Sequence, residues 1–135
     1  MDYYKLAEEE LKAIETLFVA GQYRHVITHT CLCIEYLLKT KLVQIAPTSE
    51  LLYGHDIINI FKDIQVKYKP GKDLSIGLRF CRKYLNESRY PESGTEIYTK
   101  EFAEQFLLHM EEIKYYIDNE CSATLEDLAN KYGKL

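Results

Sequence analysis

Apolar residues recur at helical spacing through most of the chain. Over residues 3–20 they follow one another in steps of four, three and four, which is typical of an amphipathic helix with one buried face. Gly21 provides a stop for this helix. The same spacing returns over residues 100–119, at Ala103, Phe106, Met110, Ile113 and Ile117. We therefore expect a long amphipathic helix on each side of the middle of the chain.

Residues 23–45 carry two apolar stripes side by side. They are Tyr23, Val26, Thr30, Cys33, Leu37 and Ile27, Cys31, Ile34, Leu38, Leu42. A helix that is apolar over so wide an arc must contact neighbours on several sides. We therefore predict that this is the central helix, and that Pro47 ends it.

Two shorter helices are predicted in the middle of the chain. The third helix follows Gly54-His55-Asp56, with Asp56 as its cap or as a first-turn carboxylate, and buries Ile57, Ile60, Phe61 and Ile64. Pro70-Gly71 breaks the chain. Asp73 then caps a fourth helix, which carries Leu74, Leu78, Cys81 and Leu85. Residues 86–99 have no helical period and are rich in polar residues, so we predict a loop of about fourteen residues.

These elements predict an all-α fold, an antiparallel up-and-down helical bundle in which the third and fourth helices are short enough to act as one broken helix. A chain of 135 residues fits one domain. We assign residues 1–121 to the bundle and residues 122–135 to a short C-terminal helix or tail. The expected core contains Ile27, Ile34, Leu38, Phe61, Leu78, Phe106, Met110 and Ile113.

Other features narrow the class of protein. No apolar run approaches the roughly 20 residues that span a bilayer, and the acidic start lacks the features of a signal peptide. We expect a cytoplasmic protein with no membrane partner. The four cysteines lack zinc-site spacing, so we expect buried reduced thiols, no metal and no cofactor. Of the four, Cys81 alone has the basic neighbours of a reactive thiol.

Charge is unevenly distributed along the chain. Residues 62–91 contain eight basic and three acidic residues, whereas the remainder contains nine basic and eighteen acidic ones. Such segregation favours a positive patch that attracts phosphate-bearing ligands. Tyr68, Tyr84 and Tyr90 lie in the same stretch, where rings can stack on bases. The alternative is that these charges are the ordinary solvated faces of two short helices.

Several motifs follow one another in a recognisable order. They are AGQYRHVITHT, LCIEYLLKTKL, GHDIINIF and CRKYLNESRYPES, followed by the long closing helix. In this order they resemble the HEPN family, the helical nucleotide-binding domains of higher eukaryotes and prokaryotes. The likeness extends from about residue 4 to residue 117. Its most specific parts are Glu35 and Lys39, Gly54-His55-Asp56, and Arg89-Tyr90-Pro91.

The resemblance implies a four-helix up-and-down bundle, often dimeric, whose members bind nucleotides or RNA. Many bacterial and archaeal members resemble partners of minimal nucleotidyltransferases in toxin–antitoxin loci. We therefore expect a homodimer with a nucleotidyltransferase partner. The candidate ligand-binding residues are His55, Arg82, Arg89 and Tyr90. The candidates for a structural polar network are Glu35, Lys39 and Pro91, with Glu35 expected to face Arg82 or Arg89. Alternatively, His55 only caps or packs, Arg89 anchors to Glu35, and Tyr90 fills the core.

Ribonuclease members of the family carry Arg, four to six residues, and then His near the start of a late helix. Here the only His after Arg89 is His109, twenty positions on. Arg24 and His29 have the spacing, but on the second helix. We therefore predict a non-catalytic nucleotide- or RNA-associated domain. A metal-independent ribonuclease using Arg24 and His29 at a dimer cleft is the alternative, and a ligand-free interaction module is the second alternative.

Overall fold

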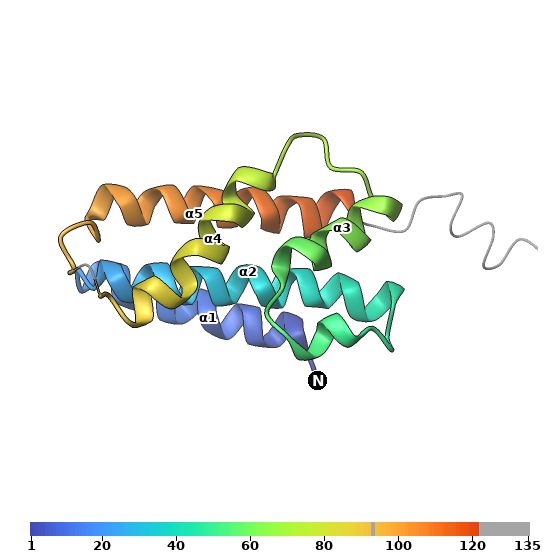
Figure 1. Ribbon diagram of the computed structural model, residues 1–135, viewed down its shortest axis with the longest axis horizontal. Coiled ribbons are helices and arrows are strands. Elements are labelled where there is room, and N and C mark those ends of the chain that lie inside the picture. The colour runs from blue at the N-terminus through green and yellow to red at the C-terminus, as the bar shows by residue number, and fades with distance from the viewer. Residues whose placement is uncertain (93, 122–135) are drawn as a thin grey trace, which may run out of the picture.

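The computed structural model describes residues 1–92 and 94–121, and within these residues it contains helices and no strand (Figure 1). The α-helices are α1 (Tyr3–Val19), α2 (Tyr23–Ile45), α3 (Ile57–Lys67), α4 (Ser75–Arg89) and α5 (Lys100–Tyr115). A short 3-10 helix, η1 (Glu50–Tyr53), precedes α3, and a π-helix, η2 (Tyr116–Glu120), continues α5. The predicted all-α class is confirmed. The predicted C-terminal helix or tail, residues 122–135, lies outside the described residues.

Helix α2 is the centre of the bundle. It packs against α1, α3, α4 and α5, as its two apolar stripes predict. In Figure 1, α1, α2 and α5 run along the length of the molecule, whereas α3 and α4 cross α2 obliquely. The third and fourth helices are therefore two separate helices at an angle rather than one broken helix. All eight predicted core residues are buried, which confirms the placement of the apolar faces.

Two glycines determine how neighbouring helices approach. Gly21 has a φ of 73° and turns the chain between the antiparallel helices α1 and α2, a conformation that favours glycine. Gly77 on α4 faces His109 on α5, where a Cβ atom would lie 2.8 Å from the ring carbon Cγ. The ring of His109 also stacks on Phe80, with centroids 5.8 Å apart. His109 is thus part of the contact between α4 and α5.

The predicted loop over residues 86–99 is wrong at its start, because α4 continues to Arg89. Ser88 explains the extra turn, since its side chain is completely buried and its Oγ lies 2.6 Å from Oγ1 of Thr28 on α2. Arg24 Nη1 also donates to the Ser88 carbonyl at 2.6 Å. These contacts from α2 hold a segment whose composition alone is typical of a loop.

The predicted helix caps are largely confirmed. Asp56 caps α3, because its Oδ1 accepts from the backbone N–H of Asn59 at 3.1 Å. Asp73 accepts from the backbone N–H of Ser75 at 2.9 Å, although Leu74 occupies the cap position of α4.

In the described part of the chain, no helix has the length and apolar character needed to cross a membrane.

Candidate functional site

A pocket of about 190 Å³ lies where α2, the start of α3 and α4 meet. We call it the Glu35 pocket. It is lined by Cys31, Glu35, His55, Ile57, Cys81, Arg82, Leu85, Asn86 and Arg89. Three of the four candidate ligand-binding residues, His55, Arg82 and Arg89, are therefore brought together by the fold.

Glu35 forms the buried polar part of this pocket. Its side chain is only 3% exposed, yet both carboxylate oxygens have partners. Lys39 Nζ donates to Oε2 at 3.1 Å, and His55 Nδ1 lies 2.9 Å from Oε1. Lys39 also donates to the carbonyl of Gly54 at 2.7 Å, which ties α2 to the segment before α3. A buried carboxylate is tolerated only when it is paired in this way.

Glu35 and Lys39, both candidates for a polar network, form an ion pair, but the arginine partners predicted for Glu35 were wrong. We expected Arg82 or Arg89, and both line the pocket, but the contacts to the carboxylate come from Lys39 and His55. Lys39 lies one helical turn further along α2, which explains its reach. His55 comes from a different element, so only the return of the chain at α3 brings it there.

The orientation of His55 follows from its contact with Glu35. Its side chain is 72% exposed, with Nδ1 directed at the carboxylate. The other ring nitrogen, Nε2, makes no hydrogen bond within residues 1–92 and 94–121. It is therefore left for a polar contact with a ligand in the pocket.

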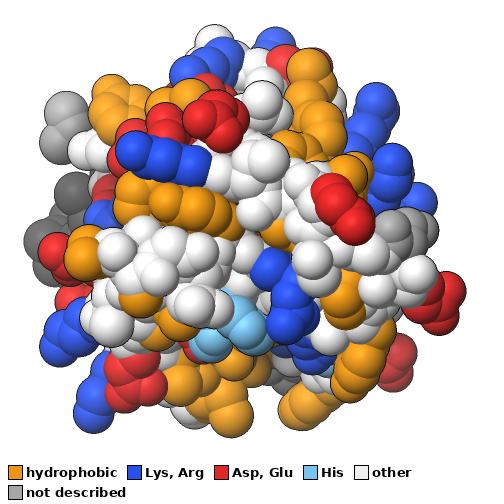
Figure 2. Space-filling model, turned by 90° about the vertical axis from the view of Figure 1, so that its left-hand side faces the viewer, with side chains coloured by type: hydrophobic (Ala, Val, Ile, Leu, Met, Phe, Trp, Pro, Cys, Tyr) orange, Lys and Arg blue, Asp and Glu red, His pale blue; other side chains and the backbone are white. Residues whose placement is uncertain are grey.

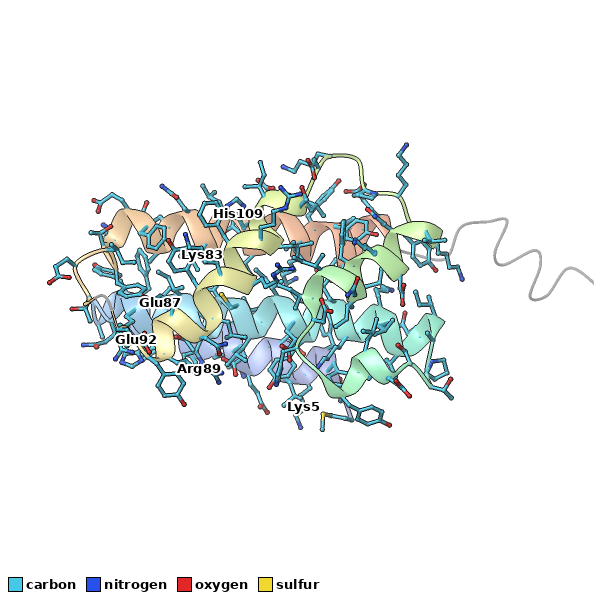
Figure 3. The ribbon with its side chains drawn as sticks, viewed as in Figure 1. Lys5, Lys83, Glu87, Arg89, Glu92 and His109 are labelled. Carbon is cyan, nitrogen blue, oxygen red and sulfur yellow. The ribbon has the colours of Figure 1, made fainter. Side chains whose placement is uncertain are left out.

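Helix α4 contributes the rim of the pocket through Arg82, Asn86 and Arg89, which are spaced four and three residues apart on one face. Arg89 Nη2 donates to Asn86 Oδ1 at 3.1 Å, and Figure 3 shows Arg89 at the C-terminal end of α4. Sequence reasoning missed Asn86 because it placed this residue in the loop. Extending the helical spacing from Arg82 to Arg89 would have included it.

The carboxylate of Asp56 interacts with the charge of Arg82 on this rim. Asp56 has a pKa below its usual range, mainly because it accepts hydrogen bonds from the backbone and side chain of Asn59. The positive charges of Arg82 and Lys62 lower this pKa further. Asp56 therefore stays ionised near Arg82 and offsets part of the positive charge at the mouth of the pocket.

The remaining walls of the pocket are apolar. Cys31 and Cys81 are both buried free thiols, as predicted for all four cysteines. A hydrogen bond with Cys81 and burial raise the pKa of Cys31 well above its usual value. Burial of Cys81 also contradicts the setting of a reactive thiol, which must be exposed. The thiols therefore act as small apolar groups beside Ile57 and Leu85.

Tyr90 and Pro91 lie outside this pocket. Tyr90 is 71% exposed, and its ring centroid lies 5.9 Å from the guanidinium carbon of Arg89. The alternative in which Tyr90 fills the core is therefore wrong. Pro91 belongs to the turn after α4, where its carbonyl accepts from the backbone N–H of Gly94 at 3.2 Å.

Arg24 and His29 are not brought together within the chain. Five residues along an α-helix correspond to a rotation of roughly 140°, so the two side chains leave α2 on different sides. Arg24 donates to the Ser88 carbonyl on α4. His29 Nδ1 lies 2.5 Å from Oε2 of Glu10 on α1. Each is engaged with a different neighbouring helix.

The basic residues of segment 62–91 line several hollows of the surface. Arg82 and Arg89 line the Glu35 pocket, Arg79 and Lys83 line another hollow, and Lys69 and Lys72 a third. Figure 2 views one end of the molecule, where basic, acidic and hydrophobic side chains are interspersed. The Glu35 pocket is therefore selected by its convergent groups and not by overall charge.

Two further findings bear on this site. Within residues 1–92 and 94–121, no cluster of three His, Cys, Asp or Glu side chains is arranged to hold a metal ion.

Residues 1–119 match a family model described as HEPN domain. No match is found among curated proteins or among solved structures.

Proposed function

The chain belongs to the HEPN-domain family, and on this basis we propose that it binds a phosphate-bearing ligand, a nucleotide or RNA, in the Glu35 pocket without cleaving it. The main support is the convergence of Arg82, Arg89 and His55 on one pocket from different parts of the chain. Guanidinium groups donate in a fork that matches phosphate oxygens. The imidazole of His55 adds a polar group through its second ring nitrogen.

The arrangement favours binding over RNA cleavage by the family's Arg and His pair. Arg24 and His29 leave α2 on different sides and contact different helices. His109 stacks on Phe80, and Figure 3 shows it on α5 well apart from Arg89 at the end of α4. Neither histidine shares a site with an arginine at the spacing that the ribonuclease members carry.

We further propose that the protein is a homodimer that acts with a minimal nucleotidyltransferase, in a toxin–antitoxin type of system in the cytoplasm. Ile76 on α4 and Leu108 and Tyr115 on α5 are each more than half exposed, so apolar surface is available for a partner. Light scattering at micromolar concentration tests the dimer. Co-purification with the product of a neighbouring nucleotidyltransferase gene tests the second partner. A ligand-free interaction module would give a positive result in these two experiments but would bind no nucleotide and no RNA.

The binding proposal is tested by titrating the protein with a nucleotide and with a short single-stranded RNA. Arg82→Ala and Arg89→Ala should each weaken binding by about 1–3 kcal/mol, because each removes charge-assisted contacts. Arg79→Ala is the matched control, since Arg79 lies on the same helix but outside the pocket. Affinity should also fall as salt rises, because counterions are released on binding.

Melting curves of each variant separate lost contacts from lost structure. If Arg89→Ala lowers the melting temperature while the wild-type protein binds no nucleotide or RNA, Arg89 is a structural anchor. The interaction module then becomes the better interpretation. Equal losses of affinity in Arg79→Ala and Arg89→Ala would move the binding surface away from the Glu35 pocket.

A further inference from the structure

We propose that the nucleotide enters the Glu35 pocket base first, so that an amino-bearing base, guanine above all, donates to Glu35 while the phosphate stays at Arg82 and Arg89. This inference rests on the proposed function and adds two things to it. It sets the direction in which the ligand lies, and it names the class of base that the pocket selects.

The direction follows from the order of charges across the pocket. Glu35, Cys31 and Cys81 are buried, so the inner part combines a carboxylate with apolar walls. Arg82 and Arg89 are exposed and form the outer part. A phosphate at the inner end would lie against a carboxylate and away from both guanidiniums, which is unfavourable for two negative charges. With the phosphate at the rim, the apolar walls are left for a flat base.

The size of the pocket points the same way. Its volume of about 190 Å³ corresponds to the share of roughly six water molecules at about 30 Å³ each. Sites that enclose an entire drug-sized ligand usually measure about 300–1,000 Å³. The Glu35 pocket therefore has room for one ring system, while the sugar and phosphate extend to the rim. A free nucleotide and an unpaired nucleotide of an RNA strand both satisfy this condition.

The choice of base follows from the chemistry of Glu35. Each carboxylate oxygen has two lone pairs, and each accepts one hydrogen bond from within the protein, from Lys39 or from His55. Acceptor capacity therefore remains for a ligand that donates. Guanine presents an N–H and an amino group side by side, and adenine and cytosine each present an amino group. Uracil presents two carbonyl oxygens around a single N–H, and these oxygens would face the carboxylate.

The proposal is tested on the wild-type protein by varying only the ligand. Binding of GMP, IMP, UMP and ribose 5-phosphate is compared by calorimetry. GMP should bind tightest, and IMP, which lacks only the amino group, should lose about fivefold or more. UMP and ribose 5-phosphate should lose about tenfold or more. A short RNA with one unpaired guanine, compared with a uridine-only strand, distinguishes an RNA ligand from a free nucleotide.

Variants of Glu35 provide the test from the protein side. Glu35→Gln should reduce the preference for GMP over UMP towards equality. Because this change leaves Lys39 buried without a charged partner, the double variant Glu35→Gln with Lys39→Met provides a second, neutral version of the network. Loss of the GMP preference in a variant that still melts cooperatively supports the base-first orientation.

The outcomes separate this inference from the proposed function. If GMP, UMP and ribose 5-phosphate bind equally well and depend on Arg89, the base-first orientation is overturned while phosphate binding stands. A preference for UMP, or a GMP preference unchanged in both Glu35 variants, also overturns it. If no nucleotide and no RNA binds, both proposals fail together.

Discussion

Two sets of Arg and His residues in this chain behave in opposite ways. Arg24 and His29 are five residues apart on one helix, yet they point to different sides of it. Arg89 and His55 are 34 positions apart, yet they line the same pocket. Spacing along a helix sets direction, so a short separation in sequence does not bring two side chains to one ligand.

The two sets also differ in what their side chains already contact. Arg24 holds the last turn of α4 through the Ser88 carbonyl, and His29 is paired with Glu10. Arg89 donates a hydrogen bond to Asn86 Oδ1 and lies over the ring of Tyr90. In residues 1–92 and 94–121 no group accepts a hydrogen bond from Arg82. Arg24 and His29 therefore hold neighbouring helices together, whereas the guanidinium groups of Arg82 and Arg89 retain most of their donors for a ligand.

Removing Lys39 should have the largest effect and should show how strongly the pocket depends on its buried pair. Lys39→Met leaves the Glu35 carboxylate buried without its charged partner, so we expect a loss of about 3–5 kcal/mol in the free energy of unfolding. Lys41→Met is the matched control, because Lys41 lies on the same helix and donates to the exposed side chain of Gln44 at 3.0 Å. Urea denaturation of both variants measures the difference.

A loss below about 1 kcal/mol for Lys39→Met, the value typical of an exposed pair, would contradict the buried network. It would mean that Glu35 is open to water and that the inner part of the pocket is not sheltered. Equal losses in both Lys variants would instead point to a general effect of methionine on this helix.

Arg24 should matter for stability and not for ligand contacts. Arg24→Ala removes a charge-assisted hydrogen bond to a carbonyl at the end of α4, so we expect a loss of about 1–2 kcal/mol. Calorimetric melting measures it, with Gln22→Ala as a control on an exposed neighbour whose side chain makes no cap hydrogen bond. The titration of Arg24→Ala should show a much smaller loss of nucleotide affinity than Arg89→Ala. The reverse order would exchange the roles of the two arginines.

The sequence predicted the helices well wherever local signals mark their ends. The observed bounds of α2, Tyr23–Ile45, agree with the prediction because Gly21 and Pro47 flank this helix. The last turn of α4 was missed because its composition is that of a loop, and its helical form depends on contacts of Ser88 with Thr28 and Arg24. Contacts between distant segments override local preference there.

For the candidate site, the sequence pointed to several of the residues but not to the contacts between them. Clustered charge and the family motifs singled out His55, Arg82 and Arg89, which the fold brings to one pocket. The contact of His55 with Glu35 depends on the angle at which α3 starts beside α2, which no spacing in the sequence encodes. The exposed position of Tyr90 likewise depends on where α4 ends.

Asp56 should give a smaller effect that depends on pH. Asp56→Ala removes the cap of α3, which should cost about 1 kcal/mol at neutral pH. Because folding lowers the pKa of Asp56, its contribution is present above the ordinary aspartate pKa of about 4 and is lost as pH falls through the lower folded value. The difference in stability between wild type and variant should therefore shrink in acid. Gln65→Ala, an exposed change on the same helix that removes no titrating group, is the control.

The last prediction is the absence of an effect: we expect Arg24 and His29 not to cleave RNA. Metal-independent cleavage requires a base at the 2′-hydroxyl and a positive group at the same phosphate. Here the two groups diverge by roughly 140° around α2, and each is held by another helix. Purified protein should therefore leave single-stranded RNA intact on a gel, with or without divalent metal.

Cleavage abolished equally by Arg24→Ala and His29→Ala, but not by His55→Ala, would restore the ribonuclease alternative. Cleavage abolished by His55→Ala alone would instead place chemistry in the Glu35 pocket, where one imidazole already lies beside a buried carboxylate and two arginines.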